Sequence, residues 1–144
     1  FVTIDEFIST LPEAKRLNVS GSGLLDASGS VYHAQLVQLE GNYRLQQILI
    51  FRATSNQKFV LMDQSKRMDS MGGSGDWEVR DIEFKSHSLF ITFQSHWHEC
   101  SSRFTSQFQF RKGRLVVIGR KSIEENIKKN LVVESSANLL TGSA

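Results

Sequence analysis

The chain has 144 residues, of which 40% are apolar, ten are Phe and one is Pro. A chain of this length buries about two-thirds of the surface that its unfolded form exposes, so residues 1–144 are expected to fold as one domain without a metal or a disulfide. The 17 basic and 15 acidic side chains give a net charge of +2, which excludes a strong electrostatic attraction to nucleic acid or to a membrane surface. Cys100 is the single cysteine, which excludes an intrachain disulfide, and no window of about 18 apolar residues predicts a membrane span.

The first residues predict a short helix followed by a loop. Thr3 and Glu6 have the spacing of a capping box, in which each side chain can bond the other's backbone amide. Apolar side chains then recur at helical spacing, at Ile4, Phe7, Ile8 and Leu11. Pro12 predicts the end of the helix, because proline disrupts a helix interior. Residues 20–30 are rich in Gly, Ser and Asp, and this composition predicts a loop.

Short strands separated by turn signals account for most of the remaining chain. They are predicted at residues 31–40, 43–53, 58–62, 77–84 and 89–96, and as a hairpin over 104–120 that turns at Lys112-Gly113. Residues 64–75 predict a polar loop, and residues 122–131 predict either a short helix capped by Ser122 or an irregular basic loop. This pattern predicts an all-β fold, either an antiparallel sandwich, a barrel or a propeller-like sheet, with a short N-terminal helix.

His96, His98 and Cys100 form the first group with possible chemistry. On one strand they would share a face, because side chains alternate with a period of two. Imidazole and thiolate are ligands for zinc or copper, and His33 or His87 could supply a fourth. Zinc sites mostly use ligand pairs separated by two or more residues, and the sequence has no second pair. It therefore favours a solvent-facing strand end, and no metal or cofactor is predicted.

Other catalytic patterns are weaker still. The acidic residues Asp76, Glu78, Asp81 and Glu83 alternate as exposed residues of a strand do. The glycine-rich stretch 72–75 is not followed by the Lys and Ser or Thr of a phosphate loop. The residues around Cys100 match no signature of a cysteine enzyme. No catalytic residue is therefore predicted.

The stretch from Asp26 to His33 is the best candidate for a binding loop. Its small polar residues would let the backbone approach a partner closely, and Tyr32 offers a large apolar ring with a polar tip, which suits an interface anchor. A plain turn leading into a strand is the alternative interpretation. Trp77, after the glycine-rich loop, is a second candidate anchor or a core residue.

The whole chain loosely resembles a broad group of small exported bacterial β-proteins. That group has an early loop rich in Asp, Gly and Asn, a Gly-Gly loop in mid-chain, and a terminal Phe-x-Phe strand followed by an aliphatic strand and Ser-x-Asn-x-Leu-Thr-Gly. The corresponding segments here are Asp26–Gly29, Gly72-Gly73, Phe108 and Phe110, Val117–Gly119, and Ser136–Gly142. The group's early loop resembles a calcium site. Here only Asp26 is acidic, with Ser28 and Ser30 at alternate positions, which argues against calcium because that ion takes about six or more oxygen ligands.

Some members of this group resemble immunity proteins against cell-wall-degrading effectors, with a domain similar to the periplasmic lysozyme inhibitors. In those inhibitors a loop of the form Ser-Gly-x-x-Tyr plugs the enzyme's active-site cleft, and residues 28–32 fit this form. The resemblance implies a non-enzymatic periplasmic inhibitor of a cognate secreted effector, in which Phe1 either follows a removed export signal or lies inside a longer natural sequence. Its expected contacts are Ser28, Gly29, Ser30 and Tyr32 at the centre, with His33 and Trp77 outside them.

Two other functions follow from different residues. A metal-binding or enzymatic β-domain would use His96, His98 and Cys100. A structural module of the cell envelope would have no soluble protein partner.

Overall fold

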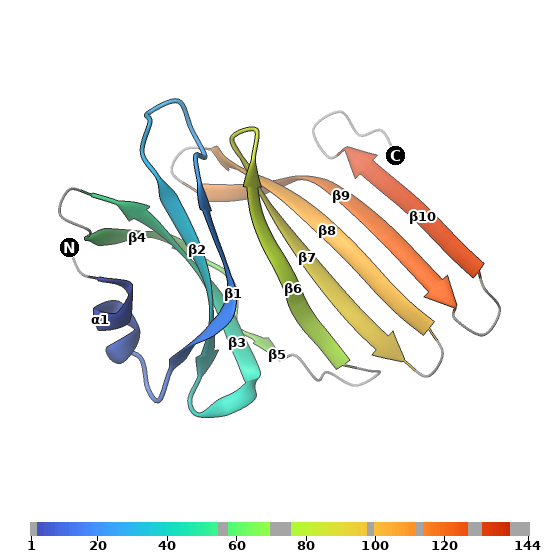
Figure 1. Cartoon of the computed structure of the whole chain (residues 1–144), viewed down its shortest axis with the longest axis horizontal. Helices are drawn as coiled ribbons and strands as arrows, with labels where there is room; N and C mark the ends of the chain where they lie inside the picture. The colour runs from blue at the N-terminus through green and yellow to red at the C-terminus, as the bar shows by residue number, and fades with distance from the viewer. Residues whose placement is uncertain are drawn as a thin grey trace.

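A computed structural model of the chain describes residues 3–54, 58–69, 76–97, 100–111, 114–126 and 131–138. The described residues form one short helix and two antiparallel sheets, arranged as in Figure 1. This confirms the all-β class with a short N-terminal helix, and of the three expected architectures the sandwich fits. Several predicted features lie outside the described residues: Phe1, the turn at residues 55–57, residues 70–75, His98, Lys112-Gly113, residues 127–130 and residues 139–142.

The first sheet is built from the N-terminal half of the chain. Its strand order is β1-β2-β3-β4, and the short strand β5 also pairs with β3. The elements of this half are α1 (Ile4–Ser9), β1 (Lys15–Gly23), β2 (Tyr32–Leu39), β3 (Asn42–Ala53), β4 (Phe59–Gln64) and β5 (Met68–Asp69).

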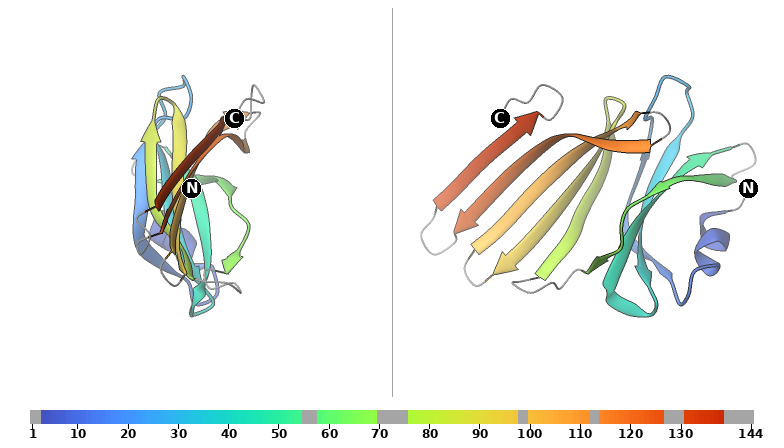
Figure 2. Two further views of the ribbon diagram at one scale, coloured as in Figure 1. Left: turned by 90° about the vertical axis from the view of Figure 1, so that its right-hand side faces the viewer. Right: turned by 180° about the vertical axis from the view of Figure 1, so that it is seen from behind.

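The second sheet is a meander of five strands in the order β10-β9-β8-β7-β6. Its strands are β6 (Asp76–Lys85), β7 (Ser88–Trp97), β8 (Cys100–Arg111), β9 (Arg114–Asn126) and β10 (Leu131–Asn138). In Figures 1 and 2, β10 lies at the edge farthest from the first sheet, whereas the end of β8 and the start of β9 reach back beside the first sheet, where the Leu115 amide donates to Asp63 of β4.

Strands β2 and β3 are buried on both faces, and they separate two cores. Side chains of alternating residues point to opposite faces of a sheet. Tyr32, Ala34, Leu36, Ile48 and Ile50 contribute to a core shared with the second sheet. This inter-sheet core is completed from the other side by Val79, Ile82, Leu89 and Ile91. The intervening residues Val37, Leu39, Leu49 and Phe51 form a second core.

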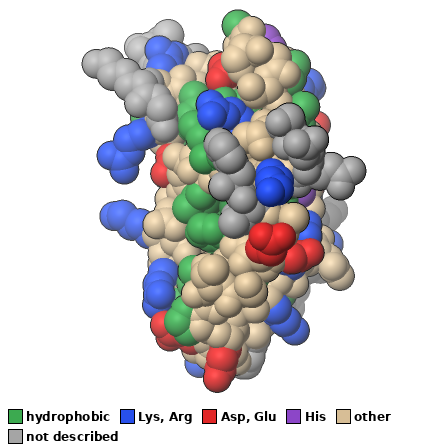
Figure 3. Space-filling model, turned by 90° about the vertical axis from the view of Figure 1, so that its left-hand side faces the viewer, with side chains coloured by type: hydrophobic (Ala, Val, Ile, Leu, Met, Phe, Trp, Pro, Cys, Tyr) green, Lys and Arg blue, Asp and Glu red, His purple; other side chains and the backbone are tan. Residues whose placement is uncertain are grey.

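The helix α1 covers the second core. Thr3 caps it, because its side-chain oxygen accepts from the Glu6 amide at 3.1 Å. Ile4 and Ile8 lie one turn apart and are both buried against the sheet. The helix ends at Ser9, before Pro12, as the sequence predicts. On the side of the molecule that carries α1, acidic and basic side chains are interspersed, as Figure 3 shows.

Three parts of the sequence prediction are wrong. Residues 68–69, predicted as part of a polar loop, form the short strand β5, because they pair with Leu45 and Gln46 of β3. Residues 20–23, predicted as loop, complete β1, because they pair with the residues from Tyr32 to Gln35. Residues 122–126, predicted as helix or basic loop, continue β9, because both β8 and β10 pair with them. In each case backbone pairing with neighbouring strands overrides a weak local preference.

Close contact between β1 and β6 holds one side of the two sheets together. A Cβ atom on Gly21 would lie 2.7 Å from the Ile82 carbonyl oxygen, and one on Gly23 would overlap the Phe84 side chain. Glycine is therefore required at both positions by the approach of the neighbouring strand, and not by an unusual backbone conformation.

We predict that Gly21→Ala lowers the free energy of unfolding by about 1–3 kcal/mol, because the added methyl group forces β1 away from the Ile82 backbone. Urea denaturation measures the change. Ser20→Ala, at the adjacent exposed position on the same strand, is the control and should leave stability within about 0.5 kcal/mol of the wild type. Equal stability of the two variants would contradict the close approach of β1 and β6.

Candidate binding site

The connection between β1 and β2, residues 24–31, projects from one end of the molecule, and we call it the β1–β2 loop (Figure 1). The turn between β6 and β7 lies at the same end, because β1 and β6 run side by side up to Gly23 and Phe84. The loop therefore begins at a point where strands of both sheets lie side by side.

Asp26 organises this loop through both of its carboxylate oxygens. Oδ1 accepts from the Ser28 backbone amide at 3.0 Å and also from the Ser28 hydroxyl. Oδ2 accepts from the Tyr32 hydroxyl at 2.7 Å. The Ser30 amide in turn donates to Ser28 Oγ at 3.2 Å. These bonds form a side-chain-stabilised turn, in which Gly29 supplies a left-handed conformation with φ of +81°.

The electrostatics of Asp26 favour its charged form. The hydrogen bonds from the Ser28 and Tyr32 side chains lower the pKa of the Asp26 carboxyl below its ordinary value. Burial raises the pKa of Tyr32, and its bond to Asp26 acts in the same direction. Tyr32 therefore remains a protonated donor to an ionised acceptor across the neutral pH range.

The structure corrects the expected role of Tyr32. Its side chain is only 2% exposed, and its ring packs on Phe110 with 5.1 Å between the ring centroids. The ring is therefore part of the inter-sheet core and is not presented to a partner. Its hydroxyl instead donates to Asp26, so Tyr32 stabilises the loop from a position within the core.

The surface of the β1–β2 loop combines small polar residues with two apolar ones. Ser28 and Gly29 are exposed at its tip, and Ser30 is half-buried. Leu24 is 41% exposed and Val31 is 47% exposed, so an apolar side chain lies on each arm of the loop. The expected central contacts Ser28, Gly29 and Ser30 are thus brought together on one projecting segment, and the sequence prediction missed the two apolar residues beside them.

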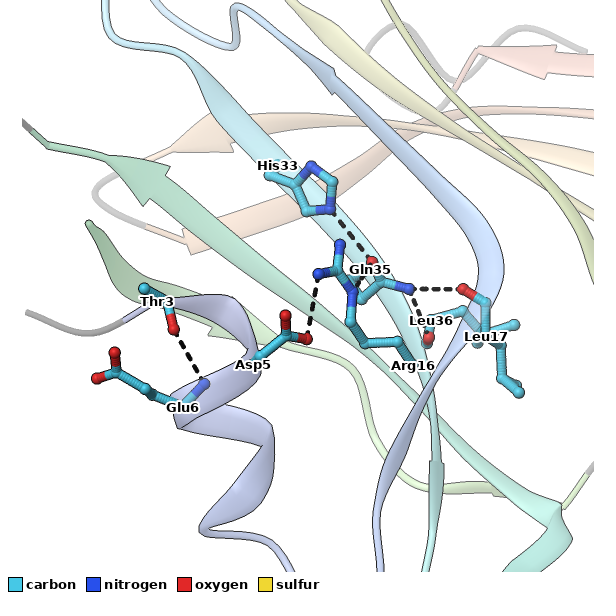
Figure 4. Close-up of polar contacts among 8 residues, drawn as sticks. All are labelled: Thr3, Asp5, Glu6, Arg16, Leu17, His33, Gln35 and Leu36. Atoms are coloured by element: carbon cyan, nitrogen blue, oxygen red, sulfur yellow. Dashed lines mark hydrogen bonds and ion pairs between the residues drawn. The ribbon is translucent and has the colours of Figure 1, made fainter. Parts of the chain in front are cut away.

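His33 lies within the sheet rather than on the rim of the loop. Its Nδ1 is 2.7 Å from Ser22 Oγ, and its Nε2 is 3.3 Å from Gln35 Oε1 (Figure 4). The Gln35 oxygen can only accept, so the neutral ring donates from Nε2 and accepts the Ser22 hydroxyl at Nδ1. Burial lowers the pKa of His33, the bond to Gln35 partly offsets this, and the nearby charge of Arg16 adds to the lowering.

Gln35 is a structural residue that the sequence prediction missed. It is 1% exposed, and its Nε2 donates to the carbonyl oxygens of Leu17 at 2.8 Å and Leu36 at 2.9 Å. Its Oε1 accepts from Arg16 Nε at 3.1 Å, and Arg16 also pairs with Asp5 of α1 at 3.2 Å (Figure 4). The sequence does carry a signal for this role. Gln35 is an amide within the mostly apolar run of β2, and a buried polar group needs hydrogen-bond partners.

Trp77 lies far from the β1–β2 loop. It is the second residue of β6, whereas the loop lies beside the last residues of that strand. Lys85 lies eight positions after Trp77 along the strand, a span of about 26 Å at about 3.3 Å per residue. Trp77 therefore does not join the other predicted contacts on one surface.

The predicted His96, His98 and Cys100 group is not on a single strand. β7 ends at Trp97 and β8 begins at Cys100, and these two residues are register partners across the hairpin. The turn breaks the period-two spacing on which a common face depended, and His98 lies outside the described residues. Within the described part of the chain, no group of three His, Cys, Asp or Glu side chains could hold a metal ion.

Glu78, Asp81 and Glu83 are exposed on β6, as predicted, although Glu78 has the opposite strand parity to the other two, because the register of β6 shifts between Val79 and Asp81. Among the helices that the structure describes, none has the length and apolar character needed to cross a membrane.

Comparisons of the chain with protein-family models, with curated proteins and with solved structures give no match.

We predict that Asp26→Ala lowers stability by about 1–2 kcal/mol at neutral pH, because the Tyr32 hydroxyl and the Ser28 amide lose a charged acceptor. The folded-state pKa of Asp26 is lowered, so its contribution is present above about pH 3.8 and is lost as the pH falls through the folded-state value. Urea denaturation at pH 7 and at pH 2 measures this. Asp81→Ala, an exposed carboxylate on β6, is the matched control, and equal losses in the two variants would contradict the role of Asp26.

We predict that His33 destabilises the protein at mildly acidic pH. Its folded-state pKa lies below the ordinary value of 6.5, so the unfolded chain binds a proton more readily. His33 protonation then leaves the free energy of unfolding unaffected well above pH 6.5 and lowers it as the pH drops through that value. His33→Asn should remove this part of the pH dependence between about pH 7.5 and pH 5, whereas His87→Asn, in the exposed β6–β7 turn, should retain it. Identical pH profiles in both variants would contradict the prediction.

Proposed function

We propose that this protein is a non-catalytic inhibitor that inserts its β1–β2 loop into the cleft of a partner protein. The observation that carries the proposal is the bonding of Asp26 to Ser28 and Tyr32, which orders the loop before any partner binds. A loop already in its binding conformation avoids much of the entropy that ordering would cost on association, so it gains affinity from the same contacts.

The surface of the loop suits this role. Its tip carries Ser28 and Gly29, which allow close approach to the floor of a cleft, and Leu24 and Val31 supply apolar area on its arms. A few well-packed side chains supply most of the energy of a protein interface. We therefore assign the anchoring role to Leu24 and Val31, with the tip supplying shape and hydrogen bonds.

The resemblance of residues 28–32 to the loop of periplasmic lysozyme inhibitors supports a more specific proposal. We propose that the partner is a secreted bacterial enzyme that acts on peptidoglycan, and that this chain is its immunity protein in the periplasm. With Tyr32 in the core, the segment that would enter the cleft is residues 27–30. In this proposal the chain performs no catalysis and requires no cofactor.

The test is inhibition of peptidoglycan hydrolases by the purified protein. Muramidases of the lysozyme class are the first probes, followed by peptidoglycan amidases, with binding measured in parallel by surface plasmon resonance. For an enzyme that is inhibited, Ala27→Trp should weaken binding at least about 30-fold, because it adds bulk at the exposed tip without removing a bond of Asp26.

Asn18→Trp is the matched control, since Asn18 is exposed on β1 below the loop. It should bind as the wild type does. Equal binding of both variants would show that inhibition uses another surface. Failure to bind or inhibit any enzyme of these classes would contradict the inhibitor function itself.

A further inference from the structure

A small apolar cavity lies between the two sheets, on the side away from the contact of β1 with β6. Its volume is about 130 Å³. Its walls come from both sheets and are mainly aliphatic or aromatic: Ile48 and Ile50 of β3, Ile91 of β7, Phe108 of β8, and Leu115 of β9. Three polar residues also line it, Asp63 and Gln64 of β4 and Ser65 directly after this strand, and Gln64 is exposed, so the cavity reaches the surface beside β4.

A bulge in β4 lies beside the cavity. The register of β4 against β3 shifts between Ile50 and Phe51, so that Met62 is an extra residue in β4. The following residue, Asp63, reaches across to the second sheet, and its Oδ2 accepts from the Leu115 amide at 2.9 Å. Its Oδ1 accepts from the Gln64 amide at 2.8 Å. Asp63 therefore holds β4 against β9 at the rim, and both of its oxygens are already used.

The lining residues and the volume determine which kind of ligand the cavity can bind. Protein interiors contain few voids much larger than a water molecule, and apolar walls offer water few of the two to four polar partners that it needs. An apolar cavity of about 150 Å³ is large enough to bind benzene. The present cavity is close to that size, and five of its eight lining residues are aliphatic or aromatic, whereas Asp63, Gln64 and Ser65 also line it.

We propose that this cavity is a binding site for a compact apolar molecule of about the size of benzene, which enters beside β4. The site is distinct from the β1–β2 loop and does not depend on the inhibitor function. Its ligand contacts the inter-sheet core directly, through Ile48, Ile50 and Ile91.

The experiment is a titration of the full chain with benzene, followed by NMR of methyl groups. The methyl signals of Ile48, Ile50, Ile91 and Leu115 should shift together and saturate, with a dissociation constant below about 1 mM. The methyl groups of Ile4, Ile8 and Val37 belong to the core beneath α1. Their signals should not shift, and they serve as an internal control. Shifts that do not saturate, or that are equal in both cores, would overturn the proposal.

Two variants on β9 test the location of the site. Leu115→Phe adds bulk to the cavity wall and should weaken benzene binding at least about tenfold. Val116→Phe makes the same kind of change at the neighbouring position, which is 38% exposed and does not line the cavity, and it should bind as the wild type does. If Leu115→Phe does not fold, the saturation and location of the wild-type shifts decide the question alone. Equal binding of the two folded variants would exclude this cavity.

Discussion

The side chain of Gln35 joins β1 to β2 at the point where the pairing of these strands is irregular. Between Arg16 and Ser20 the register shifts, because β1 has more residues than its partner over this stretch. Inside this irregularity, Gln35 Nε2 donates to the Leu17 carbonyl oxygen, so the Gln35 side chain supplies a hydrogen bond between the two strands where their register is broken. A bulge bends a strand and increases its twist. The second half of β1 then runs against β6, and its end carries the β1–β2 loop.

The loop and the core are parts of one arrangement. Tyr32 begins β2, packs on Phe110 of the second sheet, and donates to Asp26 in the loop. The contact between the sheets therefore positions the group that fixes the loop. Gly21 and Gly23 have a related role, since they let β1 approach β6 closely beneath the same segment. The proposed inhibitor function requires a loop in one conformation, and the core and the strand pairing both support one.

Most of the first sheet could be predicted from the sequence, because β2 and β3 have strong apolar patterns and α1 has a cap and a following proline. The end of β1 could not, since its Gly and Ser residues are typical of loops, and the need for glycine at Gly21 and Gly23 comes from the neighbouring strand β6. The burial of Tyr32 could have been predicted, because it has the same strand parity as Ala34 and Leu36. The distance of Trp77 from the loop depends on strand order, which local patterns do not specify.

The central claim is that the β1–β2 loop is ordered in the free protein. Backbone order parameters from ¹⁵N relaxation of the amides of residues 27–30 test it most directly, in the wild-type protein without any partner. The bonds of Asp26 and Ser28 predict values near 0.85, as in the flanking strands. Values below about 0.6 would show that the loop moves freely on this timescale and would contradict the account.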